Sequence, residues 1–246
     1  MKDATISALL DLNHLFYQKF GRSFAETRRR IQPGVRRVLE ALPDKGNWLD
    51  LGCGSGWLAL EWASEGRMRG SYLGLDFSET LLDEARRNTA GLGQEIRFQQ
   101  ADLSDPGWAK GLEPGSFDGG LAFAVLHHLP GMELRRQVLS RMRSLLKPGG
   151  FFWHSEWQFQ NSAKMMARRM PWDLAGLSEA ELDEGDALLD WKAGETGSGL
   201  RYVHLFSREE LKELAQEGGF EVVEEFESDG LGGRLGLYQK WRVGRI

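Results

Sequence analysis

The chain has 246 residues, 41% hydrophobic and 27% charged, a composition typical of a globular protein with room for one large α/β domain or a core plus a modest insert. The single cysteine excludes an intrachain disulfide, and no apolar run approaches the roughly 18 residues that span a bilayer, so we expect a cytoplasmic protein without membrane contact. The net charge of −5 argues against a protein that coats nucleic acid nonspecifically.

The N-terminal residues 1–45 have the apolar spacing of helices, with positions such as Leu9, Phe16 and Phe20 on one side. Six arginines follow one another closely between positions 22 and 37. They form either the solvated face of a helix or a local basic patch on an otherwise acidic protein.

Residues 46–157 alternate short apolar runs with helical patterns. The sequence predicts strands at 47–52, 71–76, 95–100, 117–125 and 151–157, and helices at 57–66, 78–90 and 132–146. Alternation at this spacing is typical of a largely parallel sheet with helices on both faces.

The sheet pattern is interrupted at residues 158–206, whose Met- and Trp-containing stretches predict a helical insert before the sixth strand. Capping-box spacing at 178–181 and 207–210 supports helix starts at these points. Residues 207–246 then return to the core with a helix at 208–217 and strands at 220–227 and 236–243, the last of them antiparallel. We therefore expect one domain, 1–246, in which residues 1–45 and the insert cap the carboxyl edge of the sheet.

A glycine loop, DLGCGSGW, follows the first strand and opens a helix. A phosphate-loop NTPase would need Lys-Ser or Lys-Thr after its second glycine, and the dinucleotide fingerprint would need glycine where Trp57 stands. Since bulk at this position leaves little room for a pyrophosphate at the helix N-terminus, a nucleoside without phosphates fits better.

Two aspartates follow the next two strands. Asp76, twenty residues after Gly56, is placed to bind ribose hydroxyls, or else to form the turn before the helix that Ser78 caps. Asp102 is either a turn former or a ligand for the base. Cys53 has no basic neighbour that would activate it, and we interpret it as a small residue in a tight loop.

In this order, DLGCGSG, GLD (74–76), AD (101–102), FDGGLAFAVLHHL and LLKPGG resemble the motifs of class I S-adenosylmethionine-dependent methyltransferases. The resemblance covers residues 46–157 as the cofactor-binding core and implies a Rossmann-like, seven-stranded, mostly parallel sheet. It implies S-adenosylmethionine as cofactor, with Asp50 near its methionine part, Asp76 on the ribose and Asp102 near the adenine. The full set of cofactor contacts that we expect is Asp50, Gly52, Cys53, Gly54, Gly56, Asp76, Phe77, Asp102, Leu103 and Ala124.

A narrower resemblance reaches beyond the core: FAETR (24–28), AVLHH (124–128), Trp157 and RYVHLFSREEL (201–211) resemble the eukaryotic tRNA wobble-uridine carboxymethyl methyltransferases. That family esterifies a carboxymethyl group on uridine and works with a small zinc-binding activator. The resemblance therefore implies tRNA and such an activator as partners, and it places the insert on the substrate side.

A carboxylate acceptor is ionised at neutral pH, so it needs an anion clamp and no general base. Arginine suits a clamp through its bidentate fork, and Arg28 and Arg201 are the candidates, with a structural ion pair as the alternative role. On a helix, His127 and His128 would diverge by roughly 100°, so only one can face the site, and we favour His127 as the catalytic or substrate contact. His204 is either a substrate contact or a hydrogen-bonded structural histidine.

Three functions are left open by these residues. The first is methylation of a modified uridine in tRNA, and the second is a small-molecule O- or N-methyltransferase with a lidded pocket. Tryptophans in and near the insert suit either a lined pocket or base stacking. The third is a cofactor-binding partner subunit, which the intact loop and Asp76 disfavour. We expect no metal, because no His, Cys or acidic cluster has metal-ligand spacing.

Overall fold

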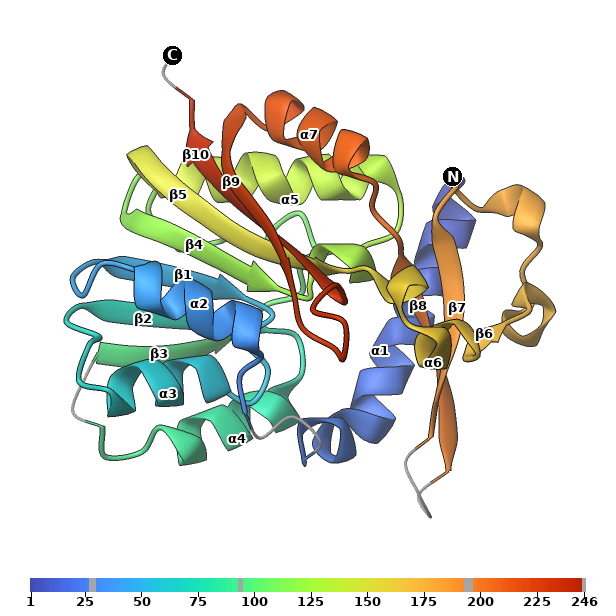
Figure 1. Cartoon of the computed structure of the whole chain (residues 1–246), viewed down its shortest axis with the longest axis horizontal. Coiled ribbons are helices and arrows are strands. Elements are labelled where there is room, and N and C mark those ends of the chain that lie inside the picture. The colour runs from blue at the N-terminus through green and yellow to red at the C-terminus, as the bar shows by residue number, and fades with distance from the viewer. Residues whose placement is uncertain (27–29, 93–94, 193–196, 245–246) are drawn as a thin grey trace.

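The computed structural model describes residues 1–26, 30–92, 95–192 and 197–244 (Figure 1). Its main sheet has seven strands in the order β3-β2-β1-β4-β5-β10-β9. β1 to β5 run parallel, and β10 runs antiparallel to both β5 and β9, so the predicted fold class is confirmed. The strands are β1 Asn47–Leu51, β2 Ser71–Asp76, β3 Glu95–Gln100, β4 Phe117–Phe123, β5 Leu146–Trp157, β9 Phe220–Ser228 and β10 Gly236–Val243.

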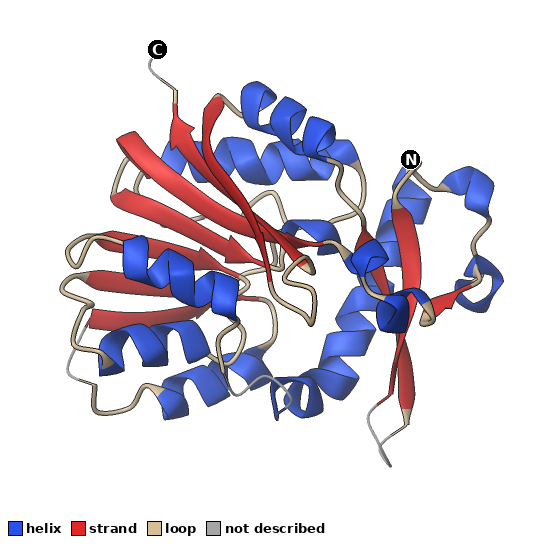
Figure 2. Ribbon diagram, viewed as in Figure 1, coloured by secondary structure: helices blue, strands red, loops and turns tan. Residues whose placement is uncertain are grey.

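Helices cover both faces of this sheet (Figure 2). Because side chains alternate along a strand, neighbouring residues of β1 enter different cores. Trp48 packs with α2 and α3, whereas the fully buried Leu49 packs with α5 and α7 and contributes about 1.5–3 kcal/mol by its burial. The helices are α2 Pro33–Ala41, α3 Trp57–Ser64, α4 Glu79–Asn88, α5 Met132–Leu145 and α7 Arg208–Glu217.

The insert contains a sheet of three strands beside short helical turns, and the prediction of a helical insert was therefore wrong. β6 Arg169–Met170, β7 Asp186–Lys192 and β8 Ser198–His204 form a second, antiparallel sheet. A continuous apolar run fits a buried helix and a buried strand equally well, and β7 is buried on both of its faces. Helical structure in the insert is limited to short turns: η2 Phe159–Asn161, α6 Ala163–Met166, η3 Trp172–Ala175 and η4 Glu179–Glu181.

The long helix α1, Asp3–Glu26, lies between the insert and the main sheet (Figure 1). Asn13 fixes it there, since its side chain accepts a hydrogen bond from the backbone N of Tyr202 (2.8 Å) and donates to the backbone O of Tyr202 (3.2 Å). α1 and the insert thus lie at the carboxyl ends of the parallel strands, while α2 packs on the sheet face instead of joining them. Within the described residues, no helix combines the length and the apolar character needed to cross a bilayer.

Candidate functional site

The glycine loop turns the chain sharply between β1 and α3. Gly52, Gly54 and Gly56 all have positive φ (65°, 54° and 73°), a conformation that disfavours any other residue. A Cβ on Gly52 would lie 2.7 Å from Val125, whereas one on Gly54 would meet no atom within 4 Å. The loop therefore packs against the β4 side at Gly52 and leaves open space at Gly54.

That open space belongs to a cavity of about 260 Å³, which we call the glycine-loop cavity. Most of the predicted cofactor contacts line it, and the structure brings them together from the ends of four strands. Gly56 forms the N-cap of α3 next to it, and Asp50 lines the adjoining cavity described below. The predicted residues on its wall are Gly52, Cys53, Gly54, Asp76, Phe77, Asp102, Leu103 and Ala124.

Asp76 holds the glycine loop in place while facing the cavity. One carboxylate oxygen accepts from the backbone N of Gly54 and the other from the backbone N of Ser78, each at 2.9 Å. Burial raises the pKa of Asp76 to about 6, although these backbone donors act in the opposite direction. The turn-forming role is therefore real, and the oxygens retain lone pairs for a ligand.

Asp102 is paired with His14 of α1 across the far end of the cavity. His14 Nε2 lies 3.1 Å from an Asp102 oxygen, and the His14 ring packs 4.8 Å from that of Phe77. Burial alone would raise the pKa of Asp102, but hydrogen bonds from His14 and Ser104 outweigh it and hold this pKa at about 2. The Asp102 hydrogen bond in turn raises the pKa of His14.

Sequence reasoning missed the contribution of α1 to this cavity. Leu10, Asn13, His14 and Tyr17 all line it. They are spaced by three, one and three residues, which places them on one helical face. A helix face that packs on a core is normally apolar, so the polar residues Asn13, His14 and Tyr17 on this face of α1 were the sequence signal for a cavity.

A second cavity of about 330 Å³, the arginine cavity, adjoins the first and is lined by Arg30, Arg168 and Arg201. Arg201 comes from β8, Arg168 from the residues after α6, and Arg30 from the residues before α2. The two cavities share part of their wall, so a group held in one can reach a group held in the other. The shared residues are Gly52, Cys53, Leu58, Phe123, Ala124 and Trp157.

Arg201 is only 2% exposed, with its guanidinium 4.5 Å from the Trp157 ring. Asp50 lies on the same cavity and accepts a hydrogen bond from the Tyr72 hydroxyl. Burial raises the pKa of Asp50 to about 7 despite this bond. Arg28, the other predicted clamp residue, lies outside the described residues.

The histidine pair is placed the other way round from our prediction. His128 lines the glycine-loop cavity, where its Nε2 lies 3.1 Å from the Tyr17 hydroxyl. His127 is fully buried, with Nδ1 2.8 Å from a Glu156 oxygen, and its backbone N donates to the same oxygen at 3.0 Å. The pair lies on a 3-10 turn, η1 Leu126–His128, where Glu156 at the end of β5 draws His127 inward.

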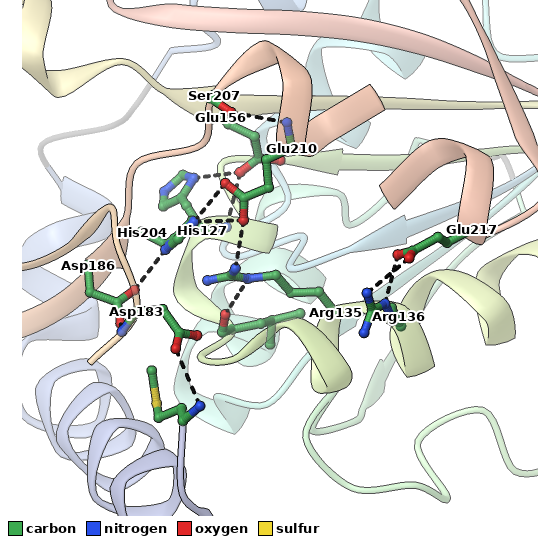
Figure 3. Close-up of polar contacts among 12 residues, drawn as sticks. His127, Arg135, Arg136, Glu156, Asp183, Asp186, His204, Ser207, Glu210 and Glu217 are labelled. Atoms are coloured by element: carbon green, nitrogen blue, oxygen red, sulfur yellow. Dashed lines mark hydrogen bonds and ion pairs between the residues drawn. The ribbon is translucent and has the colours of Figure 1, made fainter. Parts of the chain in front are cut away.

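His204 fits the structural alternative. Its Nδ1 lies 2.7 Å from Asp186 and its Nε2 2.9 Å from Glu210, which also pairs with Arg135 (Figure 3). Arg135 in turn donates to the Tyr202 hydroxyl and so extends this polar network. This network joins β7 and β8 of the insert to α5 and α7 of the core. It borders a separate cleft between insert and core, and His204 is not among the described residues that line the two cavities.

Comparison with known proteins gives a family match. The family model of a methyltransferase domain matches residues 23–225. A protein of Encephalitozoon cuniculi that is named as a methyltransferase is 31% identical over 86% of this chain and 88% of its own length. The tRNA (carboxymethyluridine(34)-5-O)-methyltransferase of Schizosaccharomyces pombe is 26% identical over 86% of this chain and 89% of its own length.

Solved structures share the fold. The 1,6-didemethyltoxoflavin-N1-methyltransferase of Burkholderia thailandensis, with bound 1,6-didemethyltoxoflavin and S-adenosylhomocysteine, aligns with a TM-score of 0.67 and 20% identity over 100% of this chain and 92% of that one. A chain from the complex between the Haloferax volcanii Trm112 methyltransferase activator and a methyltransferase aligns with a TM-score of 0.64 and 16% identity, over 96% of this chain and 98% of that one.

Proposed function

The chain belongs to the methyltransferase domain family and is an S-adenosylmethionine-dependent methyltransferase, and from this premise we propose that its acceptor is the carboxylate of a carboxymethyl-type uridine in tRNA. The arginine cavity carries the proposal. It offers arginine for a carboxylate and aromatic rings for a base, directly beside the cavity proposed for the cofactor.

The glycine-loop cavity fits the cofactor by the chemistry of its wall. Gly54 leaves the space into which a side chain would otherwise project, and the carboxylates of Asp76 and Asp102 are acceptors for ribose hydroxyls and an adenine amino group. Asp50 lies toward the arginine cavity, on the side where the cofactor's ammonium group would be held. These roles are carried by the resemblance and by the placement of the residues.

When bound, S-adenosylmethionine supplies a sulfonium methyl group, and an acceptor carboxylate oxygen takes it as a methyl ester while the C–S bond breaks to leave neutral S-adenosylhomocysteine. The protein then has no proton to move. Arg201 orients the carboxylate, and the Trp157 ring packs against the Arg201 guanidinium, on the wall that the two cavities share. Catalysis comes from positioning rather than from a general base.

Transfer of labelled methyl to defined RNA tests this function. Purified protein, with and without an activator, should label tRNA that carries 5-carboxymethyluridine and should not label tRNA that carries unmodified uridine. The label should be released by mild alkali, as expected of an ester. A stable label, or label on unmodified tRNA, would contradict a carboxylate acceptor.

A small-molecule acceptor is the second candidate. A neighbour of the same fold holds one small heteroaromatic substrate, and the arginine cavity is of a size for a single ring system. Labelling of a small acid from cell extract, with no labelling of any tRNA in the presence of activator, would favour this candidate.

We also propose a small zinc-binding activator as partner. The support is the resemblance to the wobble-uridine enzymes and a neighbour of the same fold that is paired with the Trm112 activator. Co-expression with such an activator should raise the yield and the specific activity of the protein. An equal specific activity with and without the activator would contradict this proposal.

A further inference from the structure

The arginine cavity contains more positive charge than one carboxylate needs. Arg201 is buried, Arg168 is half-buried and Arg30 is exposed, so the three side chains are graded from the interior toward solvent. Of the carboxyl groups on the same wall, Asp50 is partly protonated at neutral pH because burial raises its pKa to about 7. Asp229 accepts hydrogen bonds from two neutral donors, at 2.9 and 2.6 Å, and one carboxylate offsets only one of the three arginines.

The two outer arginines lie close to anchored stretches of backbone. The carbonyl of Arg168 accepts from the backbone N of Asp190 on β7 at 2.9 Å. Arg30 lies three residues before the start of α2, where Gly34 N is bonded to Asp229. The side chain of Arg168 therefore leaves a fixed point at the cavity wall, and Arg30 lies on the same wall just before the anchored start of α2.

Their side chains also differ from those of nearby arginines. Arg36 and Arg37 of α2 form ion pairs with glutamates at 2.8 to 3.3 Å. Within the part of the chain that the structure describes, neither Arg30 nor Arg168 has a carboxylate partner. Unneutralised guanidinium groups at the mouth of a cavity attract a second anionic group of the substrate.

We propose that Arg30 and Arg168 bind the backbone phosphates that flank the reacting nucleotide, while Arg201 holds the carboxylate on its base. This inference rests on the proposed function and makes the preferred substrate an RNA strand, not the free nucleoside. A base that enters a cavity from a single-stranded loop brings a phosphate on each side to the mouth of that cavity. The exposure of the three arginines matches this arrangement, with buried Arg201 at the base and the more exposed Arg168 and Arg30 at the phosphates.

Kinetics with matched substrates test the roles of the two arginines. The substrates are an anticodon stem-loop RNA carrying 5-carboxymethyluridine and the free 5-carboxymethyluridine nucleoside. Arg168→Ala and Arg30→Ala should each raise the KM for the RNA by roughly three- to tenfold, leave kcat unchanged, and lower the slope of log KM against log salt by about 0.7. For the nucleoside, kcat/KM should stay within about twofold of the wild-type value.

Arg169→Ala is the matched control. Arg169 is exposed and lines the separate cleft between insert and core, and its substitution removes the same charge as Arg168→Ala. Arg168→Lys keeps the charge and should recover most of the RNA affinity, which a purely structural role of the guanidinium would not allow. Unchanged cofactor affinity and melting temperature will show that the variants fold.

Equal losses on the RNA and the nucleoside would overturn the inference, since Arg30 and Arg168 would then act on the base or the carboxylate. The same salt slope in Arg169→Ala and Arg168→Ala would overturn it too, because overall charge would explain the effect. If the wild-type protein with activator methylates neither substrate, the proposed function fails, and this inference fails with it.

Discussion

At the scale of single residues, we expect Asp50 to make cofactor binding depend on pH. Its carboxyl has a pKa of about 7 and is therefore largely protonated below that pH, whereas the cofactor's ammonium group favours the ionised form. Between about pH 6 and 7.5 the affinity should rise by roughly eightfold, the ratio of the ionised fractions at pKa 7. Asp76, with a pKa of about 6, acts in the same direction.

Calorimetric titration across this pH range measures the effect. Asp50→Asn should bind weakly, with most of the slope removed. Tyr72→Phe should move the inflection to higher pH, because the Tyr72 hydrogen bond lowers the pKa of Asp50. A wild-type affinity that does not change with pH would show that Asp50 is not near the cofactor's charged group.

The His14–Asp102 pair should slow release of the cofactor. Both side chains are about a third exposed (28% and 37%), so the ion pair should contribute only about 0.5–1 kcal/mol to holding the cavity closed around the cofactor. His14→Ala and Asp102→Asn should each speed release of S-adenosylhomocysteine by roughly two- to fivefold. In stopped-flow measurements, a double variant that releases no faster than either single one identifies the pair as the unit, and additive effects would contradict it.

Arg201→Lys tests the clamp. Lysine keeps the charge but loses the planar fork, so kcat/KM for the acceptor should fall by roughly ten- to a hundredfold. Cofactor affinity should stay unchanged, because Arg201 lies on the arginine cavity and not on the glycine-loop cavity. Single-turnover kinetics at saturating acceptor test this role, since a normal rate in the variant would show that Arg201 does not position the carboxylate.

The glycine loop, Asp76 and Asp102 could be predicted from the sequence because local spacing defines that site. For His14 the polar spacing of α1 was the only sequence signal, and it does not name the partner, since the face that a helix presents to a distant loop depends on tertiary packing. Choosing between His127 and His128 required the 3-10 turn and the position of Glu156, which adjacent histidines alone do not reveal.

At the scale of elements, α2 and β10 meet without space for a methyl group. A Cβ on Gly34 would lie 2.3 Å from the Tyr238 ring, and Tyr238 lines the arginine cavity. Gly34→Ala should therefore destabilise the protein by about 1–3 kcal/mol and raise the KM for the acceptor, with cofactor affinity unchanged. Chemical denaturation measures the first effect. Gly232→Ala, where a Cβ meets nothing within 4 Å, is the control and should be close to neutral.

Strands and helices of the main sheet followed from the sequence to within a few residues, because period-2 and period-3.6 patterns are local. The strands of the insert could not be predicted in this way. The apolar stretch around Leu188 and Leu189 is buried on both faces, so its sequence shows no alternation of apolar and polar residues. The helical turn predicted from Ser178 is present but ends at Glu181, where the chain turns toward β7.

At the scale of the whole molecule, the cofactor should stabilise core and α1 together, since both line its cavity. At a hundredfold excess over the dissociation constant, S-adenosylhomocysteine should add about 2.7 kcal/mol, or roughly 5–10 °C in melting temperature. Differential scanning fluorimetry measures this shift. Asp76→Ala should reduce it, and an unchanged shift in that variant would contradict the ribose role.

The hydrogen bonds between Asn13 and Tyr202 also order events during biosynthesis. These residues are 189 positions apart, so α1 leaves the ribosome early, and its contacts with β8 can form only after β8 has followed. Its contacts with Phe77 and Asp102 need much less of the chain. β5 acquires its second neighbouring strand later still, when β10 emerges and pairs with it. The described residues that line the glycine-loop cavity all lie at or before Trp157, so this cavity can assemble before the last strands are made, whereas the attachment of α1 to the insert must wait for β8.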